Sequence, residues 1–196
     1  MAYINKITQT KTQIINSFLQ LLLEKNFQNI TINDITEKSK INRSTFYRHY
    51  LDKYDLLDKI ENEVVENINN NYSLEIPKMF FQNDIDDFEK FSNRALILFD
   101  LVHKNLEVIS ILFSNNTQTT LKVKLLKLVK KNINYATENL PELKKIENKD
   151  MLIAYASATI IGLLEYWIEH KEKTPKEIFN FWSKLLRGAL RELVTN

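Results

Sequence analysis

The chain contains very few of the residues that break helices or form tight turns. Of its 196 residues, only 2 are glycine and 3 are proline. Folds built from short strands need many tight turns, and those turns rely on glycine because it tolerates positive φ angles. This scarcity predicts an all-α fold, and the length is sufficient for one or two domains with a buried core.

Apolar residues recur at helical spacing through most of the sequence, which predicts about nine helices. The predicted helices cover residues 10–26, 32–39, 43–50, 52–70, 84–103, 106–113, 117–139, 149–170 and 175–194. We interpret residues 69–83 as the joint between an N-terminal module and a C-terminal helical bundle. The predicted domains are residues 1–55 and 56–196.

Two of these helices have explicit start signals. Thr31 stands three residues before Asp34, the spacing of a capping box. Thr174 is followed by a proline at the first helical position and by Glu177, whose carboxylate can reach back to the start of the helix. Both signals fix the helix boundaries locally.

Composition argues against several classes of protein. The chain has no cysteine, which excludes a disulfide framework and thiolate metal sites and fits a reducing cytoplasm. Residues 1–13 lack the apolar core of a signal peptide, so we expect a cytoplasmic protein. Residues 1–60 carry nine Lys and Arg against six Asp and Glu, although the net charge of the whole chain is only +2. That local surplus points to a polyanionic partner, but it is also typical of an ordinary solvated surface.

Residues 41–57, INRSTFYRHYLDKYDLL, mix cationic and aromatic side chains. On a helix Phe46 and Tyr50 share one face and can pack inward together with Ile41. The other side of that helix carries the groups that reach phosphates and base edges in a DNA major groove. These are Arg43, Ser44, Thr45, Tyr47 and Arg48. With the two-turn helix just upstream, the segment has the proportions of a helix-turn-helix.

The run from Thr31 to Leu57 resembles the DNA-binding domain of TetR-family transcriptional regulators. The family pattern of Thr-hydrophobic-x-x-Ile-Ala, then Val-Ser-x-Gly/Ala-Thr-hydrophobic-Tyr-x-His-Phe, then x-x-Lys-Glu-x-Leu-Leu can be followed through this run without a gap. The resemblance extends over about residues 10–57. The simpler alternative is an amphipathic helix pair with a solvated charged face.

The resemblance implies a role for each matching residue. Thr31 would cap the second helix close to the DNA backbone, and residues 43–45 would enter the groove. Tyr47 and His49 would be directed at phosphate, and Lys53 would add its charge to the N-terminus of the fourth helix as a phosphate clamp. The predicted DNA-contact residues are Thr31, Asn42, Arg43, Ser44, Thr45, Tyr47, Arg48, His49 and Lys53.

Two positions depart from the family pattern. Lys40 stands where the turn usually carries glycine, and a left-handed lysine costs roughly 1 kcal/mol relative to glycine. Ser44 stands where the family often has Gly or Ala and adds a hydroxyl. No base preference can therefore be carried over.

Residues 151–168 are nearly all apolar, and Glu165 is their only charged residue. A membrane span needs roughly 20 apolar residues, whereas this run is shorter and includes Ser157 and Thr159. A helix that is apolar all round is otherwise buried on both sides. We therefore expect one side in the core of its own chain and the other against a second subunit, with no membrane. A core helix of a monomer is the alternative.

The resemblance agrees with a dimer, because in that family the last two helices of each subunit form a four-helix interface. A dimer would also place paired recognition helices on a palindromic site. The predicted interface residues are Ala154, Ala158, Ile161, Gly162, Glu165, Trp182, Leu186 and Ala189.

The resemblance also implies a small-molecule effector pocket among the middle helices. Arg94, His103, Tyr135 and Trp167 could reach an interior, but ordinary core or surface positions explain them better, so the pocket residues are left open. The segment 155–168 is similar to regulators of dihydroxyacetone-kinase operons, some of which act as coactivators through a partner protein.

No catalytic pattern is visible. The three histidines lie far apart in the sequence, and neither a His-Glu-x-x-His motif nor a glycine-rich phosphate loop occurs. We expect no enzyme, metal or cofactor. The leading hypothesis is a ligand-responsive repressor that binds a palindromic operator as a homodimer. The alternative is a coactivator whose C-terminal bundle binds a partner protein.

Overall fold

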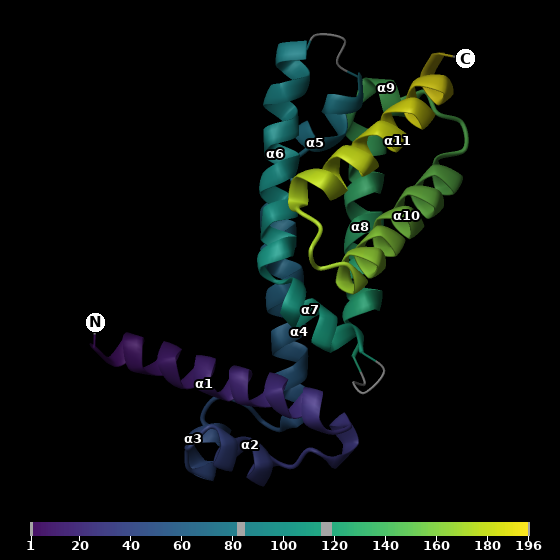
Figure 1. Cartoon of the computed structure of the whole chain (residues 1–196). Coiled ribbons are helices and arrows are strands. Elements are labelled where there is room, and N and C mark those ends of the chain that lie inside the picture. Colours follow the sequence, from purple (N-terminus) through teal and green to yellow (C-terminus); the bar gives the residue numbers. More distant parts are fainter. Residues whose placement is uncertain (1, 82–84, 115–118, 196) are drawn as a thin grey trace. The chain divides into compact units, whose positions relative to one another are not determined.

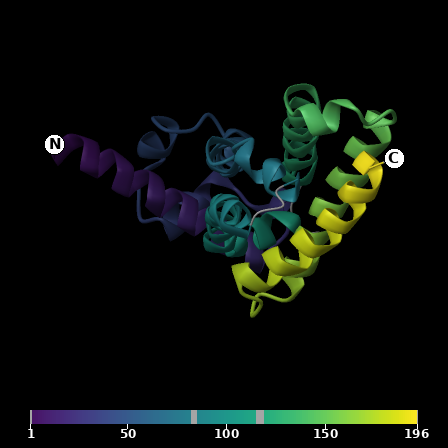
Figure 2. The same ribbon diagram turned by 90° about the horizontal axis from the view of Figure 1, so that it is seen from above.

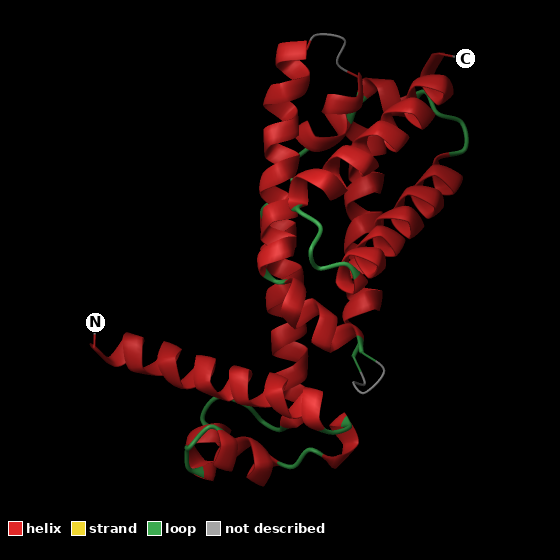
Figure 3. Ribbon diagram, in the orientation of Figure 1, coloured by secondary structure: helices red, strands yellow, loops and turns green. Residues whose placement is uncertain are grey.

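The computed structural model describes residues 2–81, 85–114 and 119–195, with side chains described for residues 9–80, 92–114 and 119–190. Within these residues every regular element is a helix (Figure 3), as the all-α prediction requires. The elements (Figure 1) are α1 (Ala2–Glu24), η1 (Phe27–Asn29), α2 (Ile32–Lys38), α3 (Arg43–Tyr47), α4 (Lys53–Asn70), α5 (Glu75–Lys78), η2 (Met79–Phe81), α6 (Ile85–Lys104), α7 (Leu106–Phe113), α8 (Leu121–Asn139), α9 (Pro141–Lys144), α10 (Lys149–Glu169) and α11 (Pro175–Thr195).

Each of the nine predicted helices is present; α7 has the predicted bounds, and the other helices have shifted ends. The recognition helix α3 is shorter than predicted, and α1 begins earlier. The predicted start of α8 falls on residues 117 and 118, outside the described part, and α8 begins at Leu121. The sequence did not predict η1, α5, η2 or α9. Two of these, α5 and η2, lie in the stretch 69–83 that was interpreted as a joint.

The chain divides into two compact units, residues 1–64 with 108–121 and residues 65–107 with 122–196. Apolar side chains from four helices and η1 form the core of the first unit. Phe18 of α1, Phe27 of η1, Ile35 of α2, Phe46 of α3 and Leu56 of α4 are completely buried. Burial of such large side chains is the dominant favourable contribution to folding of a small unit. The predicted division at residue 55 stays a prediction.

Within the first unit, a buried carboxylate joins α4 to the two residues that precede α8. Glu61 of α4 is 1% exposed. Its oxygens accept hydrogen bonds from the hydroxyl of Thr119 at 2.6 Å, from the backbone N–H of Thr120 at 2.8 Å and from the hydroxyl of Thr120 at 2.6 Å. Both threonines directly precede α8, which has no acidic residue in its own first turn. Glu61 therefore supplies negative charge at the N-terminus of α8 from another helix.

The second unit has a larger apolar core, to which the unpredicted short helices contribute. Met79 and Phe80 of η2 pack with Leu143 of α9 and with Phe179 and Trp182 of α11 in one buried cluster. The Phe80 and Trp182 rings meet edge to face with centroids 5.3 Å apart. Both views show α10 and α11 side by side (Figures 1 and 2). The elements that the sequence did not predict are thus part of the core.

The one positive φ angle among the described non-glycine residues belongs to Lys40, at 54°. We expect Lys40→Gly to raise the free energy of unfolding by about 0.5–1 kcal/mol, because glycine adopts this conformation without steric cost but loses more entropy on folding. Urea denaturation measures the change. Lys40→Ala is the matched control, since it removes the charge and keeps the strain. An equal gain in both variants would contradict the explanation.

Candidate functional site

The start of α2 is held by a capping box, as the sequence predicted. The hydroxyl of Thr31 accepts the backbone N–H of Asp34 at 3.2 Å, and the Asp34 carboxylate accepts the backbone N–H of Thr31 at 2.7 Å. The ammonium of Lys25, just beyond α1, lies 2.8 Å from the same carboxylate. Hydrogen bonding from Lys25 and from the Thr31 backbone lowers the pKa of Asp34 to about 2. This carboxylate therefore ties the end of α1 to the beginning of α2.

The turn between α2 and α3 is a Schellman motif that explains Lys40. The N–H of Lys40 donates to the carbonyl of Glu37 at 3.1 Å, and the N–H of Ile41 donates to the carbonyl of Thr36 at 3.0 Å. Such a motif needs one residue in the left-handed region, usually glycine. Lys40 takes that position, as predicted, and the turn aims the chain into α3.

The two faces of α3 separate as predicted. Phe46 is completely buried and Tyr50, just after the helix, is 4% exposed. Arg43, Ser44 and Arg48 are exposed. A short, exposed row of cationic and hydroxyl groups thus stands on a helix whose other face is fixed in the core. These groups can donate to phosphates and to acceptors on base edges.

Two further groups extend this row. Tyr47 is 54% exposed, although its ring also meets that of Phe46 edge to face at 5.6 Å. One guanidinium nitrogen of Arg48 donates to the hydroxyl of Thr45 at 3.0 Å. Asn42 occupies the position before α3, but its side chain makes no capping hydrogen bond. The Asn42 amide therefore keeps its hydrogen-bonding capacity for another partner.

His49 lies partly buried in an electropositive environment. Burial and, next, the positive charges of Lys11, Arg48 and Lys59 lower its pKa below the ordinary value of 6.5. At pH 7 the imidazole is therefore neutral and has one N–H to donate. The clustering of cations around it marks this edge of the first unit as a region of positive potential.

Lys53 has partners that the sequence did not suggest. Its ammonium donates to the carbonyls of Phe27 at 2.9 Å, Gln28 at 2.9 Å and Ile30 at 2.8 Å, and burial lowers its pKa. An ammonium has three donors, so a direct phosphate contact would displace one of these carbonyls. The role of Lys53 as a phosphate clamp stays a prediction. Its hydrogen bonds to the carbonyls of Phe27 and Gln28 show that it joins α4 to η1. This joining role was missed because η1 itself was not predicted.

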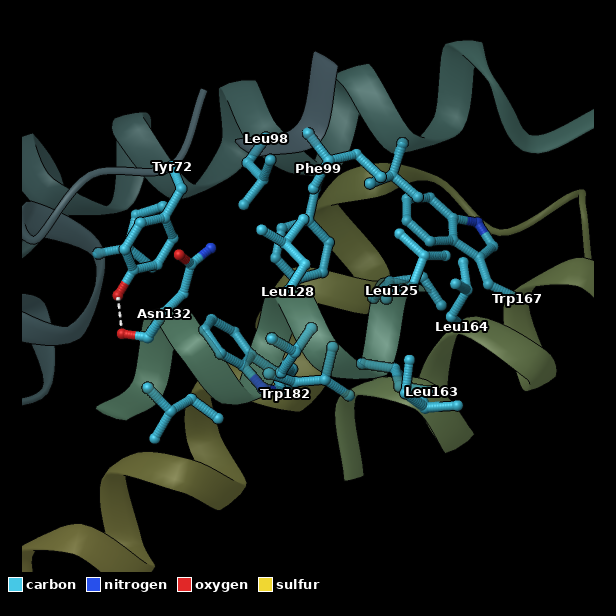
Figure 4. Close-up of a pocket in the computed structure, with 18 residues that line it drawn as sticks. Tyr72, Leu98, Phe99, Leu125, Leu128, Asn132, Leu163, Leu164, Trp167 and Trp182 are labelled. Atoms are coloured by element: carbon cyan, nitrogen blue, oxygen red, sulfur yellow. Dashed lines mark hydrogen bonds between the residues drawn. The ribbon is translucent and has the colours of Figure 1, made fainter. Parts of the chain in front are cut away.

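The second unit contains a partly open cavity of about 160 Å³ (Figure 4). Its walls come from α4 through Ile68, and from α5, α6, α8, α10 and α11. Trp167 lines it, unlike the other aromatic and charged residues considered from the sequence. Arg94 pairs with Glu75, and Tyr135 is 51% exposed. The exposed His103 stacks on Trp167 at 5.5 Å.

An exposed apolar groove runs between α10 and α11. The groove has a volume of about 600 Å³. Tyr155, Phe181 and Leu185 line it and are 60%, 60% and 57% exposed. In the sequence, nothing distinguishes these three residues from the apolar residues of the core. Large apolar side chains that gather on an exposed surface are typical of interaction sites.

The predicted interface residues divide into three groups. Ala154, Ala158, Gly162 and Ala189 are exposed, as expected for a ridge that a second subunit could approach. Leu186 is partly buried, and the Glu165 carboxylate pairs with Lys122 of α8. Ile161 and Trp182 are 6% and 9% exposed and line the cavity of their own chain. An interface role for all eight stays a prediction.

By length and composition, α10 is the one helix among the described residues that could cross a membrane. Only 22% of its most apolar window is buried within the chain. The same length and composition occur in helices that pack against other protein. In this structure one side of α10 contributes Leu152 to the core of the second unit.

A helix-turn-helix whose second helix is fixed by a buried face and exposes cationic side chains defines a DNA-binding transcriptional regulator. A family model for the bacterial regulatory proteins of the TetR family matches residues 14–60, and a model for a transcriptional regulator C-terminal region matches residues 89–188. The chain belongs to the TetR family. This confirms the resemblance read from the sequence and places the chain in a family that is not enzymatic.

Relatives agree with this membership. The uncharacterized HTH-type transcriptional regulator YxbF of Bacillus subtilis (strain 168) is 27% identical over 175 residues. The match covers 88% of this chain and 43% of YxbF, so the chain spans less than half the length of that relative.

Solved structures share the fold. The dihydroxyacetone kinase operon activator DhaS superposes with a TM-score of 0.62 at 17% identity, covering 94% of this chain and 98% of DhaS. A TetR-family regulator from Syntrophomonas wolfei str. Goettingen gives a TM-score of 0.63 at 19% identity, covering 96% of each chain.

The Asp34 anchor predicts a pH-dependent stability. Its pKa is about 2 in the folded chain against an ordinary 3.8, so the unfolded chain binds more protons between these values. Its contribution is therefore complete above pH 4 and is lost as pH falls toward 2. We expect Asp34→Asn to lower the free energy of unfolding by about 1–2 kcal/mol at pH 7, with a smaller loss at pH 3.

Chemical denaturation at both pH values measures this difference. Asp100→Asn, at an exposed position on α6, is the control and should change little at either pH. A loss for Asp34→Asn that is the same at pH 7 and pH 3 would contradict the proposed ion pair.

Proposed function

We propose that this TetR-family regulator is a repressor that binds a palindromic operator as a homodimer and releases it on binding a small molecule. The observation that carries the DNA-binding part is the exposed face of α3, which presents Arg43, Ser44 and Tyr47 on a helix whose buried face is fixed by Phe46. These side chains match the donors that enter a major groove.

The homodimer is supported by the surface of α10 and α11. An apolar groove with exposed Tyr155, Phe181 and Leu185 would be costly to leave in water, and it is flanked by small residues that permit close helix approach. Both glycines of the chain, Gly162 and Gly188, lie on these two helices, and an added Cβ at either would meet no atom of the same chain within 4 Å. A second copy offers the same apolar face, so the contact would be isologous.

The ligand response is supported by the continuity of α4. The helix begins at Lys53, which is bonded to η1, and its Ile68 lines the cavity. A molecule in the cavity could therefore shift α4 and with it the spacing of two recognition helices in a dimer. Such a molecule changes operator affinity only if it binds one spacing more tightly than the other.

The alternative is a coactivator whose bundle binds a partner protein. The same exposed groove favours it, and the name of DhaS identifies that structural neighbour as an operon activator. The two proposals differ in what covers α10 and α11, so the mass of the purified protein in solution separates them.

Changes in the recognition face should weaken specific binding. We expect Arg43→Ala and Tyr47→Ala each to weaken binding at least tenfold to a duplex selected from a random library by the wild-type protein, a loss of about 1.4–3 kcal/mol. Wild-type affinity should also fall steeply as salt rises, because phosphate contacts release counterions.

Electrophoretic mobility shift titrations measure these affinities, and circular dichroism checks the fold. Lys145→Ala, an exposed lysine just after α9, is the charge-matched control and should bind normally. Unchanged affinity in folded Arg43→Ala and Tyr47→Ala would overturn the assignment of α3.

Disruption of the groove should give monomers. We expect Phe181→Asp to halve the mass measured by light scattering or sedimentation, because the charge would be buried without a partner. Val123→Asp, at a position on α8 that is 53% exposed, is the control and should stay dimeric. A wild type that is monomeric at micromolar concentration would contradict the homodimer.

A further inference from the structure

Building on the proposed ligand response, we propose that the cavity selects small uncharged molecules, an aromatic or short aliphatic body with one hydrogen-bonding group placed against Asn132. Neither the fold nor the relatives specify the chemical class of the effector. The polar groups that line the cavity, the partners that they already have and the volume of the cavity do so.

Among the residues whose side chains the structure describes, none that lines the cavity is charged. Of the 18 lining residues, Asn132 is the only one with a side chain that is neither aliphatic nor aromatic. A carboxylate or ammonium in such a site would lose its hydration without gaining a counter-ion, which is strongly unfavourable. Burial raises the pKa of the Tyr72 hydroxyl to about 12, so this group stays neutral as well. The cavity therefore discriminates against ions of either sign.

Besides the Asn132 amide, the walls carry the Tyr72 hydroxyl and the indole N–H groups of Trp167 and Trp182, and the Tyr72 and Trp167 groups are already engaged. The Tyr72 hydroxyl donates to the backbone carbonyl of Asn132 at 3.1 Å, and the Trp167 indole N–H donates to the carbonyl of Lys173 at 2.8 Å. These bonds also fix the two aromatic rings as rigid walls. Neither group can serve a ligand without losing its present partner.

The side-chain amide of Asn132 is different. It lies between Tyr72 and Leu128 in the cavity (Figure 4), and within the described residues it makes no hydrogen bond. An amide offers a carbonyl acceptor and two N–H donors, so it can meet a hydroxyl or a carbonyl equally well. Its partly buried position makes one such contact to a ligand favourable, because an amide left unpaired in an apolar site is costly.

The size of the cavity limits the ligand. Apolar protein cavities of about 150 Å³ bind benzene, and this one has a similar volume of about 160 Å³. A monocyclic aromatic alcohol or a short alcohol fits, whereas a long acyl chain would need the walls to move.

Tryptophan fluorescence can report ligand binding, because both tryptophans of the chain, Trp167 and Trp182, line the cavity. Benzyl alcohol, benzoate, benzylamine and toluene share one ring and differ in the group attached to it. Titration of the full chain with each, followed by tryptophan fluorescence and by thermal stability, gives four affinities without DNA. We expect benzyl alcohol to bind at least tenfold more tightly than benzoate or benzylamine.

Two pairs of variants locate the binding. Val129→Phe, which points a larger side chain into the cavity, should abolish binding, whereas Val123→Phe on the exposed face of the same helix should leave it intact. Asn132→Leu should weaken benzyl alcohol at least fivefold and leave toluene unchanged or tighter. If Val129→Phe unfolds, the Asn132→Leu comparison still decides the role of the amide.

Benzoate or benzylamine binding as tightly as benzyl alcohol would overturn the proposal, as would failure of both neutral probes to bind at their solubility limits. Equal losses of benzyl alcohol and toluene in Asn132→Leu would overturn the role of Asn132. Selective binding of neutral probes that leaves operator affinity unchanged would instead support the cavity chemistry and contradict the ligand response in the proposed function.

Discussion

The ammonium of Lys53 joins the parts of the first unit that the recognition helix depends on. It donates to three backbone carbonyls around η1 and lies 4.7 Å from the centre of the Phe27 ring. Without it, the carbonyls of Phe27, Gln28 and Ile30 would each lose a hydrogen bond, which is most costly at the partly buried Phe27 and Ile30. The five-residue α3 is too short to be stable alone, so its shape depends on this frame and on the burial of Phe46.

The helix α4 carries two side chains, Lys53 and Glu61, that hydrogen-bond to residues far away along the chain. Along α4, Lys53 bonds to η1, Glu61 bonds to the threonines before α8, and Ile68 forms part of the cavity wall. The helix α8, whose start Glu61 caps, contributes Leu125 and Asn132 to the same cavity. Each of α4 and α8 therefore begins with residues of the first unit and continues to residues that line the cavity.

Features set by neighbouring residues could be predicted from the sequence. The capping box at Thr31, the left-handed Lys40 and the two faces of α3 all depend on spacing within a few residues, and all are present. Features set by distant residues could not. The carbonyl partners of Lys53 require η1, and the threonine partners of Glu61 lie 58 and 59 residues away along the chain.

The helices α10 and α11 illustrate the same limit. Apolar periodicity places their helices correctly but does not reveal that Trp182 faces the interior while Phe181 faces solvent. Hydrogen–deuterium exchange of the full chain, with and without a selected operator duplex, tests the central claim that α3 is the DNA-reading element. The account predicts that the largest gain in protection falls on residues 42–50. Protection confined to α8, α10 or α11, with none at 42–50, would contradict it.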